Sequence, residues 1–147
     1  MRVLVVNGPN LNLLGVRRPD VYGTATLAEL EEHCRAWGAA LGIEVETFQS
    51  NHEGEIIDRL HDALLSADGV VLNPGALAHY SYALHDAVES IQLPVVEVHL
   101  SDITGREEWR ARSVVSPACA ATISGRGLDG YREALELLAA GLPRRSP

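Results

Sequence analysis

The stretch VLVVNGPN, residues 3–10, decides the fold of this 147-residue chain. Residues 3–6 form an unbroken apolar run rich in valine, and residues 7–10 consist of turn-forming types. A short apolar run that ends abruptly at Asn, Gly and Pro is typical of a strand buried on both faces. Such strands belong to parallel sheets that are covered by helices on both sides.

Four more strands are expected downstream, each separated from the next by a helical pattern. The strands are expected near residues 43–48, 69–72, 94–98 and 120–124. Helices are expected from Thr26 to Gly42, through residues 56–64 and 83–91, and over residues 128–140. This alternation predicts one domain, residues 1–147, with a doubly wound, flavodoxin-like α/β sandwich and strand order 2-1-3-4-5. Residues 143–147 are expected to be a frayed tail.

Two of these helices carry a predicted capping box at their start. Glu29 follows Thr26 by three residues, and Glu53 follows Ser50 by the same spacing. Each pair can satisfy the free backbone N–H groups of a first helical turn. Beyond the second pair, an apolar stripe is expected to face the core; it consists of Ile56, Ile57, Leu60 and Leu64.

The charge composition excludes several classes of protein. All twelve basic residues are arginine, so enzymes that need a lysine amine and Lys-containing P-loops are excluded. The net charge of −8 argues against nucleic-acid binding, and no apolar run approaches the ~18 residues of a membrane span. The two cysteines form no disulfide framework, no Cys/His spacing matches a zinc site, and the N-terminal apolar run is too short for a secretory signal. We therefore expect a cytoplasmic domain without a metal site.

Polar or turn-forming residues follow each of the predicted strands. They are Asn7 and Asn10, Gln49 to Asn51, Asn73, His99 and Ser101, and Gly125. In a parallel α/β sheet all these strand ends meet at one edge, where ligands bind. Any single one of these residues can equally be a turn or cap residue, but their concentration at one edge predicts a site.

Two segments offer acid–base groups for this edge. Glu97 and His99 lie two residues apart on one face of a strand, so the carboxylate can orient the ring or keep it protonated. The long loop of residues 8–25 is expected to be a lid, in which an Arg beside Tyr22 would lower the phenol pKa. The alternatives are a structural histidine at a strand end and a tyrosine that only covers the sheet.

The segment of residues 106–110, REEWR, has two interpretations. It is either a solvated turn held by ion pairs or a means of presenting an arginine to an anionic substrate. A helix beginning directly after residues 73–75 would add free backbone N–H groups, which also favour an anion.

Taken together, these motifs resemble those of the type II 3-dehydroquinate dehydratases over about residues 3–140. The matching segments are residues 7–15, 17–19 with 22–23, 49–55, 73–76 with His79, Ser81 and Asp86, 97–101 with 106–107 and Arg110, and Gly125 to Tyr131. The resemblance implies dehydration of 3-dehydroquinate to 3-dehydroshikimate, in the shikimate pathway of aromatic amino acid and chorismate biosynthesis or in quinate catabolism. It implies no metal or organic cofactor, and a homododecamer built of trimers. A second, unrelated enzyme type uses a lysine imine, which a chain without lysine cannot form.

The resemblance also implies roles for individual residues. Tyr22 would be the base, with its pKa lowered by Arg17, and Asn10 would hold a water that stabilises the enolate. His99 would be the general acid, oriented by Glu97. Substrate contacts are implied for the backbone of Leu100 and Ser101 and for Asn73, His79 and Arg110, with Asp86 supplied by a neighbouring subunit.

Several positions depart from the family's commoner pattern. They are Arg18, Tyr80, Tyr82, His85 and Asp102. Of these, Asp102 adds a negative charge expected near the carboxylate-binding backbone, with a possible effect on affinity or on the pKa of His99. These departures keep open a binding or regulatory module that has lost turnover. A nucleotide or flavin binder of the same fold is disfavoured, because no G-x-G-x-x-G sequence follows the first strand.

Overall fold

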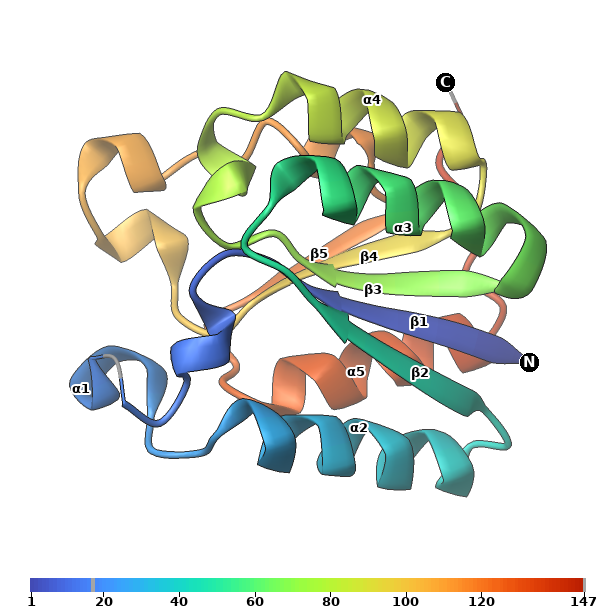
Figure 1. Cartoon of the computed structure of the whole chain (residues 1–147), viewed down its shortest axis with the longest axis horizontal. Helices are drawn as coiled ribbons and strands as arrows, with labels where there is room; N and C mark the ends of the chain where they lie inside the picture. The colour runs from blue at the N-terminus through green and yellow to red at the C-terminus, as the bar shows by residue number, and fades with distance from the viewer. Residues whose placement is uncertain (17, 147) are drawn as a thin grey trace.

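A five-stranded parallel sheet forms the centre of the molecule in the computed structural model (Figure 1). The structure describes residues 1–16 and 18–146, and for Val21 and Tyr22 the backbone alone. The strands are β1 (Arg2–Asn7), β2 (Glu44–Gln49), β3 (Gly69–Asn73), β4 (Val95–His99) and β5 (Ala121–Ser124). Their order, β2-β1-β3-β4-β5, confirms the predicted flavodoxin-like topology.

The register of the sheet aligns the ends of its central strands. Asn7, the last residue of β1, is paired with Gln49 on one side and with Asn73 on the other. His99 at the end of β4 is paired with Ser124 at the end of β5. The polar residues predicted to follow the strands therefore do gather along one edge of the sheet.

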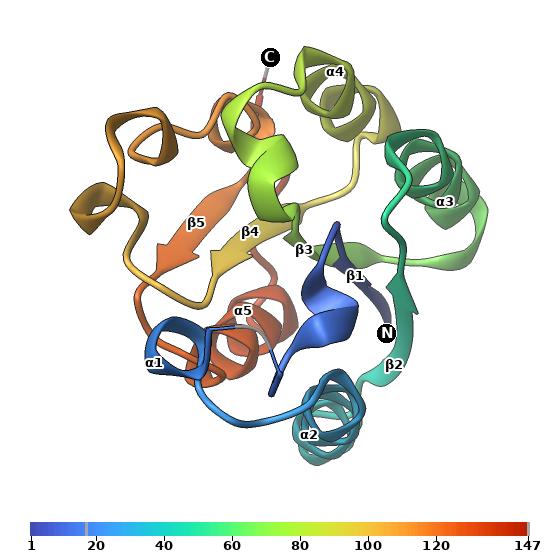
Figure 2. The same cartoon turned by 60° about the vertical axis from the view of Figure 1, so that its left-hand side comes forward.

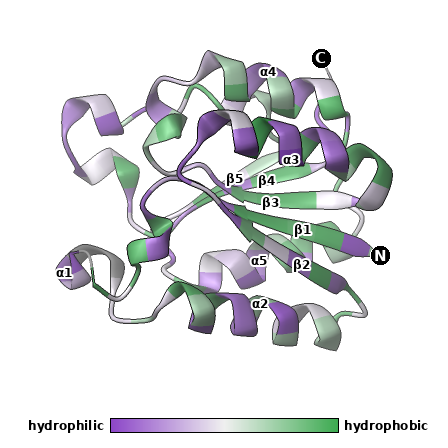
Figure 3. Cartoon of the chain, viewed as in Figure 1, coloured by the Kyte–Doolittle hydropathy of each residue, from purple (hydrophilic) through white to green (hydrophobic). Residues whose placement is uncertain are grey.

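Two pairs of helices cover the two faces of the sheet (Figure 1). One face carries α2 (Leu27–Ala40) and α5 (Asp129–Ala139), and the other carries α3 (Glu53–Ser66) and α4 (Tyr82–Ile91). Each face has its own buried apolar cluster, one around Val5 and Leu135 and the other around Val6 and Leu60. Strands β1, β3 and β4 are apolar along most of their length, whereas the helices are hydrophilic on their outer faces (Figure 3). No helix in the described part of the chain is long and apolar enough to cross a membrane.

The capping box at the start of α2 is confirmed. The Thr26 hydroxyl accepts a hydrogen bond from the backbone N–H of Glu29, and the Glu29 carboxylate accepts one from the backbone N–H of Thr26. Both interactions are local, which is why the sequence spacing alone was sufficient to predict them.

The predicted capping box at the start of α3 is wrong. The residue preceding this helix is His52, whose side chain makes no capping hydrogen bond. The Ser50 hydroxyl instead donates to Glu55 at 2.6 Å, and Glu53 accepts a hydrogen bond from Ser81 at 2.6 Å. Both members of the expected pair are therefore engaged by other residues, and Ser81 comes from a different connection of the fold.

The apolar stripe of α3 also differs from the prediction at one position. Ile56 and Leu60 are fully buried, but Leu64 is 49% exposed and Ala63 occupies the next core position. Positions 56, 60 and 63 follow the helical repeat more closely than 56, 60 and 64, so the small alanine faces the sheet.

Short helical segments gather beyond the carboxyl ends of the strands (Figure 2). They are α1 (Pro19–Tyr22) and the 3-10 helices at Leu11–Leu13, Gly75–His79, Ile103–Gly105, Glu108–Arg110 and Ser116–Ala118. After β3 the chain first forms a 3-10 helix, and α4 begins only at Tyr82, capped by the Ser81 hydroxyl. The helix expected directly after residues 73–75 is thus a short 3-10 helix and not the start of α4, and the Gly75 N–H donates to Asn73 Oδ1.

Candidate active site

A cavity of about 170 Å³ lies at the carboxyl edge of the sheet. Its walls include seven of the residues expected in the site: Asn10, Asn73, His79, His99, Leu100, Ser101 and Arg110. The sequence reasoning gave no role to six others that also line it: Pro9, Leu11, Gly75, Ala76, Ile103 and Arg106. Pro9 and Leu11 adjoin the predicted Asn10 in the chain, and for these two residues that adjacency was the available signal. Residues at the ends of β1, β3 and β4, and in the three connections that follow these strands, thus enclose one polar cavity.

The buried pair Glu97 and His99 lies at the end of β4. His99 Nε2 is 3.1 Å from Glu97 Oε2, and the Glu97 side chain is completely buried. The contact has the distance of an ion pair without the alignment of a hydrogen bond. Ser113 donates to the other carboxylate oxygen at 2.9 Å, and Ser116 donates to Oε2. These hydroxyls satisfy the oxygens that burial separates from water, so the carboxylate is fixed beside the ring.

His79 provides a second imidazole in the same cavity. Its Nδ1 lies 2.7 Å from the backbone carbonyl of Arg112. Because a carbonyl oxygen only accepts, Nδ1 must carry the proton, and Nε2 of the neutral ring is left as an acceptor. The ring lies 6.5 Å from that of His99, centroid to centroid, at an interplanar angle of 24°. His79 is thereby held in one tautomer and can accept a hydrogen bond from a ligand hydroxyl.

Arg110 is fixed from two sides before any ligand binds. Its Nε lies 2.7 Å from a Glu107 carboxylate oxygen, and its guanidinium carbon is 3.9 Å from the centroid of the Trp109 ring. The Glu107 carboxylate accepts a hydrogen bond from the backbone N–H of Glu107 itself. This bond, reinforced by the charge of Arg110, lowers the pKa of the Glu107 carboxyl. The rings of Trp109 and His79 also pack edge to face, with their centroids 5.4 Å apart. The turn at residues 106–110 is therefore ion-paired, as one interpretation expected, and Arg110 also lines the cavity; presentation of this arginine to an anionic substrate stays a prediction.

Close backbone packing sets the position of Asn10. A Cβ on Gly8 would lie 2.6 Å from the Pro74 carbonyl oxygen, so only glycine permits this approach. The Gly8 N–H donates to the Asn73 carbonyl at 2.8 Å. Asn10 adopts the left-handed conformation with φ 70°, which asparagine tolerates, and its N–H donates to Asn51 Oδ1 at 2.9 Å. The loops after three strands are thus locked together on one side of the cavity.

Besides Glu97, which is buried against His99 and does not itself line the cavity, three predicted site residues are not placed in the cavity by the structure. Arg17 lies outside the described residues, and for Tyr22 only the backbone, which closes α1, is described. Their predicted roles therefore stay predictions. Asp86 is exposed on α4 and does not line this cavity.

Asp102 does not face the cavity as its proximity in sequence suggested. Its carboxylate accepts hydrogen bonds from the Thr104 hydroxyl at 2.6 Å and from the Thr104 backbone N–H at 2.9 Å. These two bonds lower the pKa of Asp102. The side chain therefore caps the 3-10 helix Ile103–Gly105, and it is absent from the described lining of the cavity.

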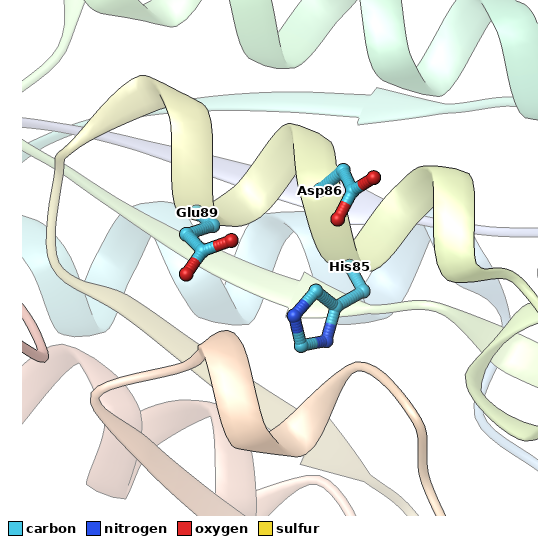
Figure 4. Close-up of side chains that lie close together, drawn as sticks. All are labelled: His85, Asp86 and Glu89. Atoms are coloured by element: carbon cyan, nitrogen blue, oxygen red, sulfur yellow. The ribbon is translucent and has the colours of Figure 1, made fainter. Parts of the chain in front are cut away.

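One cluster in the described part of the chain has the residue types of a metal site. His85, Asp86 and Glu89 on α4 have ligand atoms within 4.8 Å of one another (Figure 4). His85 Nδ1 lies 2.7 Å from the Val114 carbonyl oxygen, so the ring already fastens α4 to that segment. The two carboxylates are exposed. Because exposed acidic clusters are common without an ion, we assign no metal to it.

The fold and the cavity are those of an α/β enzyme, with imidazole, carboxylate and guanidinium groups at a strand-end crevice of the size of a small ligand. Residues 1–139 match the family model described as dehydroquinase class II. The chain is 54% identical over 133 residues to a protein of Bacillus licheniformis named 3-dehydroquinate dehydratase, covering 90% of this chain and 92% of that protein. A Bacillus cereus protein of the same name is 55% identical over 134 residues, covering 91% and 92%.

Solved structures agree with these relatives. The type II dehydroquinase from Propionibacterium acnes superposes with a TM-score of 0.92 at 43% identity, covering 95% of this chain and 96% of that one. The type II dehydroquinase from Butyrivibrio crossotus also has a TM-score of 0.92, at 46% identity, covering 94% and 97%. The chain belongs to the class II dehydroquinase family. The enzyme assignment made from the sequence is thereby confirmed.

Proposed function

We propose that this cavity converts 3-dehydroquinate to 3-dehydroshikimate and water. The observation that carries the proposal is the buried Glu97 held 3.1 Å from His99 inside a cavity that Arg110 also lines. An imidazole backed by a carboxylate can deliver a proton, and a fixed guanidinium can bind an anionic or hydroxylated ligand. The names of the relatives supply the substrate.

The first step is removal of a proton from the carbon beside the substrate ketone. Tyr22 is the base in this scheme, as a phenolate favoured by Arg17. The electron pair of the broken C–H bond moves onto the ketone oxygen and forms an enolate. A water bound by Asn10 stabilises that negative charge, as preorganised donors do at developing oxyanions.

The second step expels the hydroxyl group as water. His99 donates the proton that the departing hydroxyl needs, while the enolate electrons return to form the carbon–carbon double bond. Because Glu97 contacts Nε2, Nδ1 is the nitrogen that transfers the proton. General acid and general base catalysis each contribute roughly 10²–10⁴-fold.

The remaining cavity groups hold the substrate. The backbone N–H groups of Leu100 and Ser101 bind the carboxylate, and Asn73, His79 and Arg110 bind the hydroxyls. The exposed position of Asp86 on α4 supports its action in a neighbouring subunit's site, in a dodecamer built of trimers. Two free, buried cysteines support a reducing, cytoplasmic compartment. The reaction serves the shikimate pathway or quinate breakdown.

Turnover with 3-dehydroquinate tests the proposal directly. Product formation is followed by the absorbance of the conjugated enone, from about pH 6 to about pH 9. We expect a signal from the native protein and none from His99→Ala. A native protein that is folded but gives no signal anywhere in this range would contradict the proposal and favour a binding module.

A further inference from the structure

A phenol–amide chain lies buried directly behind the cavity. Tyr131 on α5 reaches between Asn7 at the end of β1 and Asn73 at the end of β3. Its hydroxyl lies 2.6 Å from Asn7 Oδ1 and 2.9 Å from Asn73 Nδ2. Tyr131 and Asn7 are completely buried, and Asn73 is 3% exposed. Of these three residues, only Asn73 also lines the cavity.

The direction of every hydrogen bond in this chain is fixed by one backbone group. The Gly75 N–H can only donate, and it bonds to Asn73 Oδ1 at 3.1 Å. The nitrogen of that amide must therefore face Tyr131 and donate to the phenol oxygen. A phenol has one proton, which then goes to Asn7 Oδ1. Burial also raises the pKa of Tyr131 far above its usual range, which favours the protonated phenol that donates to Asn7.

Two hydrogen bonds at opposite ends fix the plane of the Asn73 amide, whereas one would let it turn. Gly75 anchors the oxygen, and Tyr131 anchors one of the two N–H bonds. The second N–H bond of Nδ2 is thereby left as a donor for a ligand oxygen. Because of these two bonds, Asn73 presents an N–H donor to the cavity, and its side-chain oxygen is bonded to the Gly75 N–H.

We propose that Tyr131 is a positioning residue that holds the Asn73 amide for a substrate hydroxyl. The proposal rests on the function proposed above, in which Asn73 binds the substrate. Tyr131 touches no substrate itself, because it lies behind the cavity and acts through Asn73.

A double-mutant cycle separates this role from general stabilisation of the core. We expect Tyr131→Phe, which keeps the ring, to lower kcat/KM about 3- to 10-fold, mainly through KM, as for loss of one hydrogen bond. Asn73→Ala should lower it further. The double variant should lie within about twofold of Asn73→Ala alone, because Tyr131 then has no amide to position. Losses that multiply in the double variant would overturn the proposal.

A matched control lies on the opposite face of the sheet. Ile56 on α3 is fully buried in the other apolar cluster. Ile56→Val should lower the thermal midpoint without changing KM, and an equal rise of KM in this variant would show that loss of stability alone explains the effect. Should Tyr131→Phe fail to fold, Asn7→Ala can replace it, because it removes the acceptor of the phenol proton. The Asn7→Ala, Asn73→Ala double variant should then also have nearly the kcat/KM of Asn73→Ala alone.

The crystal structure of Tyr131→Phe gives a readout that does not depend on turnover. We expect the Asn73 amide to rotate or to occupy two conformers, and an unchanged single conformer would overturn the positioning role. Absence of turnover in the native protein would instead defeat the proposed function, so the two failures are distinguishable.

Discussion

Glu97 and His99 face each other across 3.1 Å at the buried end of β4, where two serine hydroxyls hold the carboxylate in place. The carboxylate has no contact with bulk water, so its charge acts almost entirely on the ring and on the serine donors. Such a pair can keep an imidazole oriented for proton transfer throughout a reaction cycle.

Replacing Glu97 with Gln tests this arrangement. The amide carries no charge and turns an NH₂ group toward one of its present donors, so the ring loses both its partner and its orientation. We expect kcat to fall roughly 10- to 100-fold in steady-state assays. The control is Glu136→Gln on the exposed face of α5, which should leave kcat unchanged. Native kcat in Glu97→Gln would contradict an orienting role.

Tyr22→Phe tests the predicted base. Removal of the phenol oxygen takes away the group that accepts the substrate proton, so turnover should fall by about 10²–10⁴-fold. The far-ultraviolet circular dichroism spectrum should be unchanged. Tyr82→Phe, at a tyrosine that is 70% exposed, is the matched control and should retain activity. If Tyr22→Phe turned over at the native rate, the base would have to be another residue.

Arg110→Lys should not behave as a conservative change. Lysine keeps the charge but has neither the planar fork that meets Glu107 nor the face that stacks on Trp109. We expect KM to rise about tenfold or more, with a smaller effect on kcat. Arg132→Lys on the exposed face of α5 serves as the control. A KM within twofold of native would show that charge alone is sufficient.

Mixing two inactive variants tests whether Asp86 acts across an interface. The Asp86→Ala subunit keeps His99, and the His99→Ala subunit keeps Asp86. A shared site is therefore complete only where an Asp86→Ala subunit supplies His99 and the neighbouring His99→Ala subunit supplies Asp86. Random reassembly of equal amounts should restore about a quarter of native activity. Each variant dissociated and reassembled alone should remain inactive. No recovery in the mixture would place both residues in the same subunit's site.

The two cysteines should be unreactive in the folded protein. Burial, with a smaller contribution from Glu31, raises the pKa of Cys34 from 9.0 to about 12, and burial also raises that of Cys119. A disulfide reagent at about pH 8 should label neither thiol until denaturant is added, and then both. Rapid labelling of the native protein would contradict the burial of these thiols.

The same thiol pKa shift gives a sign for the pH dependence of stability. Between about pH 9 and pH 12 the folded protein keeps the Cys34 proton that the unfolded chain releases, so the free energy of unfolding should fall as pH rises through this range. Urea midpoints measured at about pH 8 and about pH 10 should show the decrease. In the Cys34→Ala variant the urea midpoint should decrease less between these two pH values. An equal decrease in that variant would show that Cys34 does not contribute to the pH dependence.

Local patterns predicted the elements whose determinants are close in sequence. The valine-rich strand at residues 3–6 and the Thr26–Glu29 capping box depend on neighbours within a few residues, and both were confirmed. The Ser50–Glu53 pair has the same spacing but was wrong. Glu53 is bound by Ser81, which is 28 residues away, and no local pattern reports such a partner.

The sequence by itself determined the five strands, their alternation with helices and the edge at which Asn73 and His99 would meet; the strand order was expected only as that of the flavodoxin-like class. Hydrophobic periodicity and turn residues encode these features, because parallel strands must end together. Only the tertiary structure decided how the side chains are held. The hydroxyl of Tyr131 reaches Asn7 from 124 residues away, and the Asp102 carboxylate is bound by Thr104 as the cap of a 3-10 helix. Hydrogen-bond directions depend on which atoms the completed packing brings within 3 Å of one another, and that proximity exists only in the folded chain.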